Sequence, residues 1–117
     1  MRFLFLCCLT LGVFAQVTGD LTQGLGAARQ RIDRIDDQIV KLLNERAGIV
    51  REVGVIKVRF HAPAEAPGRY EQVLRRVSSQ AKPPLAPENV WNIYAAIVAE
   101  MSAMEKSEMS RRPASGK

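Results

Sequence analysis

The sequence contains few of the side chains that build metal centres, disulfides or nucleophilic sites. Its 117 residues include two adjacent cysteines, Cys7 and Cys8, and one histidine, His61, which lies in a proline-containing segment without partners at ligand spacing. Neither Ser78 nor Ser79 has a neighbouring base in the sequence. A Cys or His metal site needs several such ligands, and covalent catalysis needs an activated nucleophile. The sequence therefore predicts no metal, no disulfide framework and no covalent catalysis.

Both cysteines belong to an N-terminal segment that is typical of a secretory signal peptide. A positive charge at Arg2 is followed by an apolar run from Phe3 to Ala15 and by small residues. This run is too short to span a bilayer as a mature helix. We expect a signal peptide over residues 1–19, cleaved after Ala15 or Gly19, and an exported product that is periplasmic or secreted and free of the membrane. A buried N-terminal helix is the alternative.

Acidic side chains are fewer than basic ones, and the net charge is +5. Loss of Arg2 with the signal leaves +4, and the three basic residues of the C-terminal tail, 109–117, leave the folded part near +1. Non-specific binding of nucleic acid requires a basic stripe on one folded face, with interleaved aromatics for single strands. Aromatic residues make up only 6% of the chain. The sequence predicts a flexible, solvated basic tail and no nucleic-acid partner.

Strand-like alternation, internal repeats and low-complexity segments are also absent, whereas helical periodicity is strong. From about Leu25 to Val58, apolar side chains recur every three or four residues. At about 1.5 Å per residue, this helix would be near 50 Å long, which is longer than a domain of this size is wide. One compact monomer cannot bury such a stripe, so we expect a homodimer. Gly48 and Gly54 inside the helix indicate close approach by a neighbour or ligand.

Two shorter helices are expected after the long one. The stretch "GRYEQVLRRVSSQA" predicts the second, with Pro67 in its first turn. Its apolar side carries Tyr70, Val73, Leu74 and Val77. The third helix is expected to begin at Pro87, after the break "KPPLAP". The predicted fold is all-α, with one domain of a long, a short and a medium helix over residues 20–108.

Five charged side chains lie on or beside these apolar faces, where burial without a partner is costly. They are Arg29, Arg46, Lys57, Arg69 and Glu105. Arg46 and Lys57 are 11 residues apart, which is about 20° of rotation and roughly 16 Å along a helix, so they face the same way and can hold opposite ends of one small anion. Arg29 lies 17 residues before Arg46, so it reaches the same ligand only from a second, antiparallel copy of the helix.

Simpler roles exist for each of these cations taken alone. Arg46 can form a structural salt bridge with Glu45 or with Glu100 of a neighbouring helix. Lys57, near a helix end, can extend its ammonium group into solvent, and Arg69 can lie on a solvated face. Taken one at a time, these residues therefore do not distinguish ligand binding from a structural or solvated role.

Several short motifs follow one another in a fixed order along the chain. They are "RQRIDRIDDQIVKLLNERAGIVREVGVIK", "APGRYEQVL" and "VWNIYAAIVAEMSAMEK". In this order they resemble the AroQ-type, all-helical chorismate mutases over roughly residues 26–107. The resemblance implies a three-helix fold and an intertwined homodimer whose long first helix contributes to both active sites. It also implies a Claisen rearrangement of chorismate to prephenate, achieved by conformational restriction and electrostatic stabilisation without a cofactor.

The resemblance assigns a role to each charged residue. Arg29 from the partner subunit and Arg46 would bind the two carboxylates of chorismate, and Arg69 would help to order the substrate. Lys57 would donate to the ether oxygen as the C–O bond breaks. Glu105 falls where the family has Gln or Glu that also meets the ether oxygen, and a carboxyl group must be protonated to donate there. Lys57, Glu105 and Arg46 are thus the expected catalytic residues.

The sequence departs from this family pattern at two positions of the expected substrate site. Tyr70 stands where many of these mutases have a glutamate that binds the substrate hydroxyl, and a phenol can also hydrogen-bond to that group. Met101 stands where some members have serine. The related isochorismate-pyruvate lyases, which form salicylate, share the fold, the cationic residues and an "APxR" turn. A lyase and a non-catalytic helical binding module are therefore the alternative functions.

Overall fold

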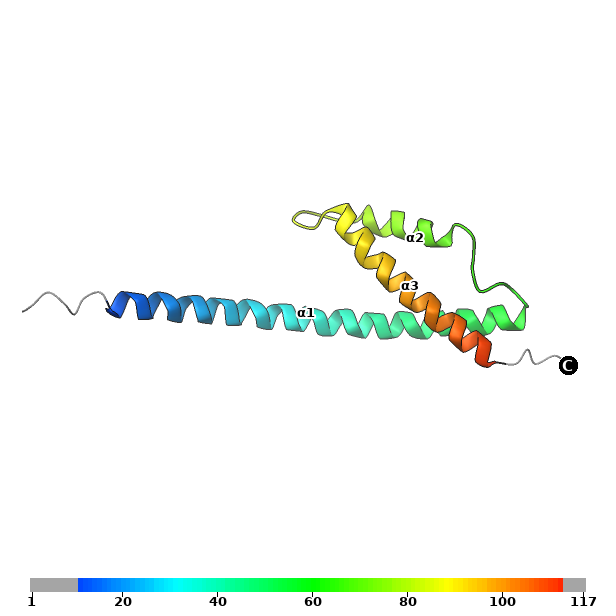
Figure 1. The fold of residues 1–117 in the computed structure, drawn as a ribbon, viewed down its shortest axis with the longest axis horizontal. Helices are drawn as coiled ribbons and strands as arrows, with labels where there is room; N and C mark the ends of the chain where they lie inside the picture. The colour runs from blue at the N-terminus through cyan, green and yellow to red at the C-terminus, as the bar shows by residue number, and fades with distance from the viewer. Residues whose placement is uncertain (1–10, 113–117) are drawn as a thin grey trace, which may run out of the picture. The chain divides into compact units, whose positions relative to one another are not determined.

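The computed structural model describes residues 11–112, with side chains for residues 18–112, and contains three helices. They are α1 (Leu11–Arg59), α2 (Arg69–Ser78) and α3 (Pro87–Arg111) (Figure 1). No strand occurs in residues 11–112, and the predicted all-α class is confirmed. The first ten residues of the predicted signal peptide, both cysteines among them, lie outside the described residues, as do residues 113–117 of the predicted tail.

The first helix begins earlier than the apolar periodicity predicted. The periodicity starts near Leu25, whereas helical backbone begins at Leu11. The first proline of the chain is Pro63, so every residue from Leu11 to Leu25 has the backbone N–H that a helix interior needs. At its other end α1 stops at Arg59, one residue beyond the predicted limit.

The chain divides into two units, Met1–Leu43 and Asn44–Lys117. The described part of the first unit is the N-terminal portion of α1. Its apolar side chains at helical spacing are exposed: Ile32 by 55%, Ile35 by 54% and Ile39 by 46%. Within this unit the apolar stripe that the sequence predicted is present and uncovered.

The second unit consists of the C-terminal portion of α1 together with α2 and α3. Its small core lies where α2 packs against α3, and Val73, Leu74 and Val77 are buried there. These are three of the four residues predicted to form the apolar side of the second helix. Tyr70, the fourth, is 46% exposed.

The start of α2 differs from the prediction. Pro67 was expected in the first turn, but the helix begins at Arg69 and is preceded by Gly68 with φ 77°. A left-handed backbone suits glycine because it has no Cβ to clash with the carbonyl oxygen. The turn at Gly68 therefore separates Pro67 from the helix and places Arg69 and Tyr70 in its first turn.

The third helix starts at Pro87, as predicted. The side-chain oxygen Oδ1 of Asn89 accepts a hydrogen bond from the Ala86 N–H at 3.0 Å, which stabilises the helix start. The helix continues to Arg111, beyond the domain limit predicted at residue 108. Residues 109–111, assigned to a flexible tail from the sequence, are therefore helical.

A glycine allows α1 and α3 to approach closely within the second unit. Gly54 is buried, and a Cβ at this position would lie 3.3 Å from Cγ of Glu105 and 3.5 Å from Cγ of Met109. A Cβ at Gly48 would meet nothing within 4 Å among the described residues. Of the two glycines singled out from the sequence, Gly54 thus marks a close helix contact.

Candidate active site

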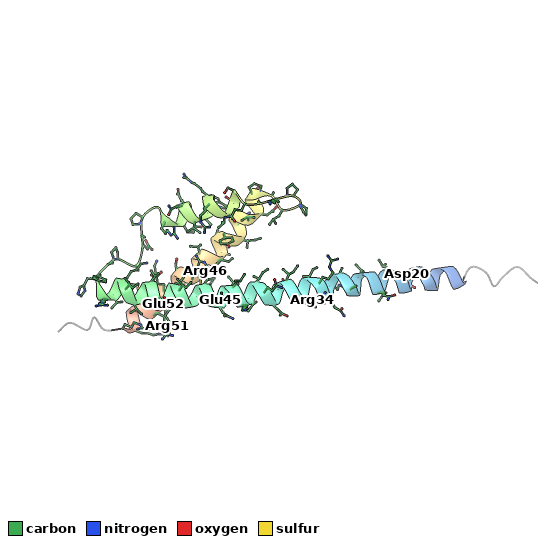
Figure 2. The ribbon with its side chains drawn as sticks, turned by 180° about the vertical axis from the view of Figure 1, so that it is seen from behind. Asp20, Arg34, Glu45, Arg46, Arg51 and Glu52 are labelled. Carbon is green, nitrogen blue, oxygen red and sulfur yellow. The ribbon has the colours of Figure 1, made fainter. Side chains whose placement is uncertain are left out.

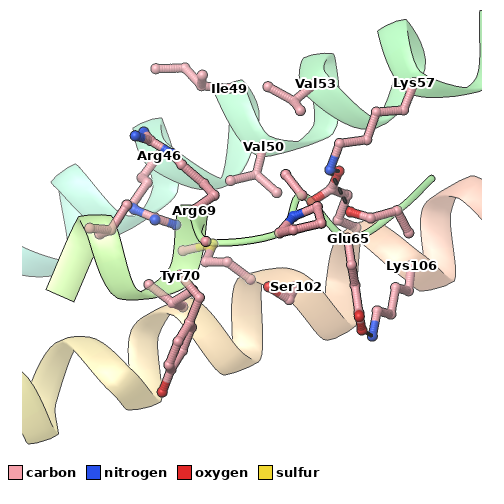
Figure 3. Close-up of a pocket in the computed structure, with 18 of the residues that line it drawn as sticks. Arg46, Ile49, Val50, Val53, Lys57, Glu65, Arg69, Tyr70, Ser102 and Lys106 are labelled. Atoms are coloured by element: carbon pink, nitrogen blue, oxygen red, sulfur yellow. Dashed lines mark hydrogen bonds and ion pairs between the residues drawn. The ribbon is translucent and has the colours of Figure 1, made fainter. Parts of the chain in front are cut away.

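A pocket of about 810 Å³ lies within the second unit (Figure 3). The C-terminal portion of α1, the segment between α1 and α2, one side of α2 and the later turns of α3 form its wall. This volume is within the usual range for small-molecule sites. The charged lining residues are Arg46, Lys57, Glu65, Arg69, Arg76, Glu105 and Lys106. With five cations and two carboxylates, the pocket favours an anionic ligand.

Arg46 is the most informative of these residues. Its nitrogen Nη1 is buried and has no hydrogen-bond partner within residues 18–112. None of the ion pairs in that range joins it to Glu45 or Glu100, the partners considered from the sequence. Leaving a buried polar group unpaired costs about 1–3 kcal/mol, so Arg46 is a candidate to bind an oxygen of a ligand.

The helix geometry directs Arg46 to one side of α1. Arg46 and Arg51 are five residues apart, which is about 140° of rotation, and Figure 2 shows them on different sides of the helix. Arg46 lines the pocket, whereas Arg51 is exposed outside it. The face of α1 that carries Arg46 therefore contributes to the pocket, and the side that carries Arg51 does not.

Lys57 and Glu105 join α1 to α3 across the pocket wall. The Lys57 ammonium nitrogen Nζ lies 2.5 Å from Oε1 of Glu105 and also donates to the backbone oxygen of Ala64 at 2.6 Å. The two side chains are 18% and 11% exposed. The prediction that Glu105 itself donates to a ligand is not tested, but here its Oε1 accepts from Lys57. The carboxylate and the carbonyl use two of the three ammonium protons and leave one.

Two further arginines contribute positive charge. Arg69 donates from Nη1 to Oε1 of Gln72 at 2.9 Å, which orients its guanidinium without neutralising it. Arg76, one residue before the buried Val77, also lines the pocket and was not identified from the sequence. In residues 18–112 neither arginine forms a salt bridge. The two carboxylates of the pocket are paired with lysines, so its arginines hold the charge surplus.

Tyr70 and Met101, the two positions at which the sequence departs from the family pattern, both line the pocket. The ring of Tyr70 points away from Arg46 and Lys57 in Figure 3, and the residue is 46% exposed. The structure therefore does not direct the phenol toward the basic residues. Met101 supplies apolar surface to the α3 wall and is partly buried.

Ser102 lines the pocket beside Met101 and was missed in the sequence. Two other helical serines bond to a carbonyl of the preceding turn, Ser78 to that of Leu74 and Ser110 to that of Lys106. Ser102 makes no such bond within residues 18–112, so its hydroxyl is available to a ligand. A single serine in an apolar helix carries no signal that distinguishes this position.

Glu65 and Lys106 form a second ion pair at the pocket edge. The Lys106 nitrogen Nζ lies 2.5 Å from Oε1 of Glu65, and the two side chains are 51% and 78% exposed. The hydrogen bond from Lys106, together with its positive charge, lowers the pKa of the Glu65 carboxyl below its ordinary value of 4.5. Neither residue was identified from the sequence, because two exposed charged residues 41 positions apart look like ordinary surface residues.

Arg29 belongs to the first unit, on the N-terminal portion of α1, and its side chain is exposed. Its predicted contribution from a second subunit stays a prediction. Among residues 18–112, no group of three or more His, Cys, Asp or Glu is arranged to hold a metal ion. No helix in the described part of the chain is long and apolar enough to cross a membrane.

Known proteins with related sequences and structures share this chain's helical region. The family described as chorismate mutase type II matches residues 28–106. A bifunctional chorismate mutase/prephenate dehydratase of Aquifex aeolicus is 34% identical over 82 residues, covering 67% of this chain and 23% of the relative. A chorismate mutase of Methanocaldococcus jannaschii is 28% identical over 87 residues, covering 74% of this chain and 88% of the relative.

The bifunctional relatives are much longer than the region of similarity. The chain spans less than a quarter of their length, at 23%, 21% and 24% for three of them. Among solved structures, chorismate mutase (form II) from Thermus thermophilus matches with a TM-score of 0.67 and 26% identity, over 70% of this chain and 93% of the other. The family match covers the pocket residues from Arg46 to Lys106, and on these grounds the chain belongs to the chorismate mutase type II family.

Proposed function

We propose that this protein is a chorismate mutase, which converts chorismate to prephenate by a Claisen rearrangement. The observation that carries the proposal is the pocket lined by both the buried, unpaired nitrogen of Arg46 and the Lys57–Glu105 pair. A dicarboxylate with an ether oxygen has acceptor groups suited to such donors. The matches to proteins named chorismate mutase support this choice of substrate.

The proposed mechanism requires no proton transfer and no cofactor. Arg46 holds one substrate carboxylate, and Arg29 of the partner subunit holds the other. The third ammonium proton of Lys57 meets the ether oxygen, where negative charge develops as the C–O bond breaks. Glu105 orients Lys57 by accepting from its ammonium group at Oε1. Arg69, with its guanidinium oriented by Gln72, orders the bound substrate.

The magnitudes favour cationic side chains over a catalytic base. An acceleration of 10⁶-fold requires about 8 kcal/mol of transition-state stabilisation. One preorganised donor directed at developing charge contributes roughly 3 to 4 kcal/mol. Holding the flexible substrate in the reactive conformation supplies more, because it removes conformational freedom before the reaction. A lysine and a few arginines are therefore sufficient.

We also propose that the protein acts as an intertwined homodimer with shared active sites. The exposed apolar residues of α1 support this, because Ile35 and Leu42 in the first unit are 54% and 62% exposed. Large uncovered apolar patches usually mark interaction surfaces. A second copy of the same helix would cover this stripe and bring a second Arg29 to the pocket.

Export is a separate part of the proposal. Residues 1–19 have the charged start, apolar run and small residues of a signal peptide, so the protein would work in the periplasm or outside the cell. Mass spectrometry of native material should find an N-terminus at Gln16 or Asp20. An intact Met1 in that material would contradict export.

The decisive experiment offers purified protein chorismate and isochorismate separately and identifies the products. Prephenate from chorismate is the expected result. Salicylate and pyruvate from isochorismate, without prephenate from chorismate, would show that the protein is a lyase and not a mutase. No reaction with either compound would leave a mutase-like fold that serves as a binding module.

A further inference from the structure

The segment between α1 and α2 forms one edge of the pocket but has little backbone support. Ala64, Glu65 and Ala66 line the pocket. Pro63 has no backbone N–H, and neither Ala64 nor Glu65 takes part in a backbone–backbone hydrogen bond within residues 11–112. Regular secondary structure therefore does not hold this part of the segment in place.

Two hydrogen bonds from lysine side chains hold it in place instead. The Lys57 ammonium donates to the Ala64 carbonyl at 2.6 Å, and the Lys106 ammonium donates to Oε1 of the next residue, Glu65, at 2.5 Å. Lys106 in turn follows Glu105, which accepts from Lys57. Ala64 is thus bound to Lys57 of α1, and the next residue, Glu65, is bound to Lys106 of α3.

We infer that Glu65 is a positioning residue for Lys57, acting through its salt bridge to Lys106. The salt bridge holds the Ala64 carbonyl where it and Glu105 take two ammonium protons, and the third proton then points to the substrate. This inference rests on the proposed function. An ion pair as exposed as this one adds little to folding stability, so its effect falls on the position of the segment rather than on the fold.

Glu65→Gln tests this role, and Glu71→Gln is the matched control. Glu71 also pairs with a cation, Arg75, at 3.0 Å on an exposed surface, but neither residue lines the pocket. In Glu65→Gln we expect kcat to fall about 3- to 10-fold with KM changed less than about 2-fold, because Lys57 acts on the transition state. In Glu71→Gln both constants should stay at the wild-type values.

The charge-swapped double variant Glu65→Lys with Lys106→Glu provides the second test. It keeps a salt bridge between the segment and α3, so it should recover most of the kcat lost in Glu65→Gln. Order parameters of the backbone N–H groups of residues 64–66, measured by ¹⁵N relaxation, should be lower in Glu65→Gln than in wild type and Glu71→Gln, and near wild type in the swapped variant. This measurement needs no substrate.

The outcomes separate this inference from the proposed function. If wild type does not convert chorismate, the mutase proposal fails, and the order parameters still decide whether Glu65 anchors the segment. Equal order parameters in the Glu65→Gln and Glu71→Gln variants overturn the anchoring role. Equal kcat in these two variants overturns the positioning of Lys57. A kcat that the charge swap does not restore overturns the salt bridge as the cause.

Discussion

The environment of Arg46 alone indicates a binding site. Arginine can bind a carboxylate through two parallel N–H bonds, and a buried guanidinium nitrogen without a partner is costly. The structure leaves Nη1 of Arg46 buried and unpaired within residues 18–112. A residue with this environment is expected to matter more for ligand binding than for folding.

Arg46→Ala should therefore remove activity without loss of structure. We expect turnover of chorismate to fall about 10²- to 10³-fold, the effect of deleting one preorganised donor. Arg46→Lys keeps the charge without the fork and should recover only part of this loss. Circular dichroism should show wild-type helicity in both variants. Unfolding of Arg46→Ala would instead identify a structural role.

For Tyr70, the predicted hydrogen bond to the substrate hydroxyl stays a prediction. Its ring is exposed and points away from Arg46 and Lys57 in Figure 3. Tyr70→Phe should therefore change kcat/KM by less than about 2-fold, because the phenol oxygen then contributes little to transition-state binding. Steady-state kinetics with chorismate would check this. A loss of 10-fold or more would show that the ring turns into the pocket when substrate binds.

At the scale of the secondary-structure elements, Gly54 controls the distance between α1 and α3. Gly48→Ala should raise the free energy of unfolding by about 0.5–1 kcal/mol, because alanine is the better helix former. Gly54→Ala should show no such gain, because its Cβ would lie 3.3 Å from Cγ of Glu105. Displacement of Glu105 should also lower kcat. Urea unfolding and turnover assays measure both, and an equal gain at both glycines would contradict the close contact.

The segment that joins α1 to α2 should give a pH-dependent contribution to stability. Lys106 lowers the pKa of Glu65 in the folded protein, so this pair stabilises the fold above the unfolded-state pKa. The contribution should decline as the pH falls below 4.5 and vanish below the folded-state pKa of Glu65. The difference in unfolding free energy between wild type and Glu65→Gln should follow this course and stay small. A difference that grows in acid would have the wrong sign.

At the scale of the whole molecule, the proposed dimer makes each active site depend on two chains. Arg29→Ala and Arg46→Ala homodimers should both be inactive. After subunit exchange in an equal mixture, half of the dimers are mixed and each has one intact site, so about one quarter of wild-type activity should return. Sedimentation should show dimers throughout. No recovery after exchange would argue against shared sites.

The sequence by itself determined the features that depend on neighbouring residues. Apolar spacing and Pro87 placed the third helix, and the same spacing identified Val73, Leu74 and Val77 as the inner side of the second. These predictions are confirmed because periodicity and capping act over one or two turns. The resemblance to a family also led to Arg46, Lys57 and Glu105, which the structure brings to one pocket.

Only the tertiary structure decided the remaining pocket contacts. The Glu65–Lys106 pair joins positions 41 residues apart, and the Lys57–Glu105 pair joins positions 48 apart. Arg76 and Ser102 look like ordinary helix residues until the packing of α2 and α3 turns them toward the pocket. Helical periodicity states which residues share a face of one helix, whereas contacts between helices depend on loop path and packing. The surroundings of Lys57 therefore follow from the fold and not from its neighbours in the sequence.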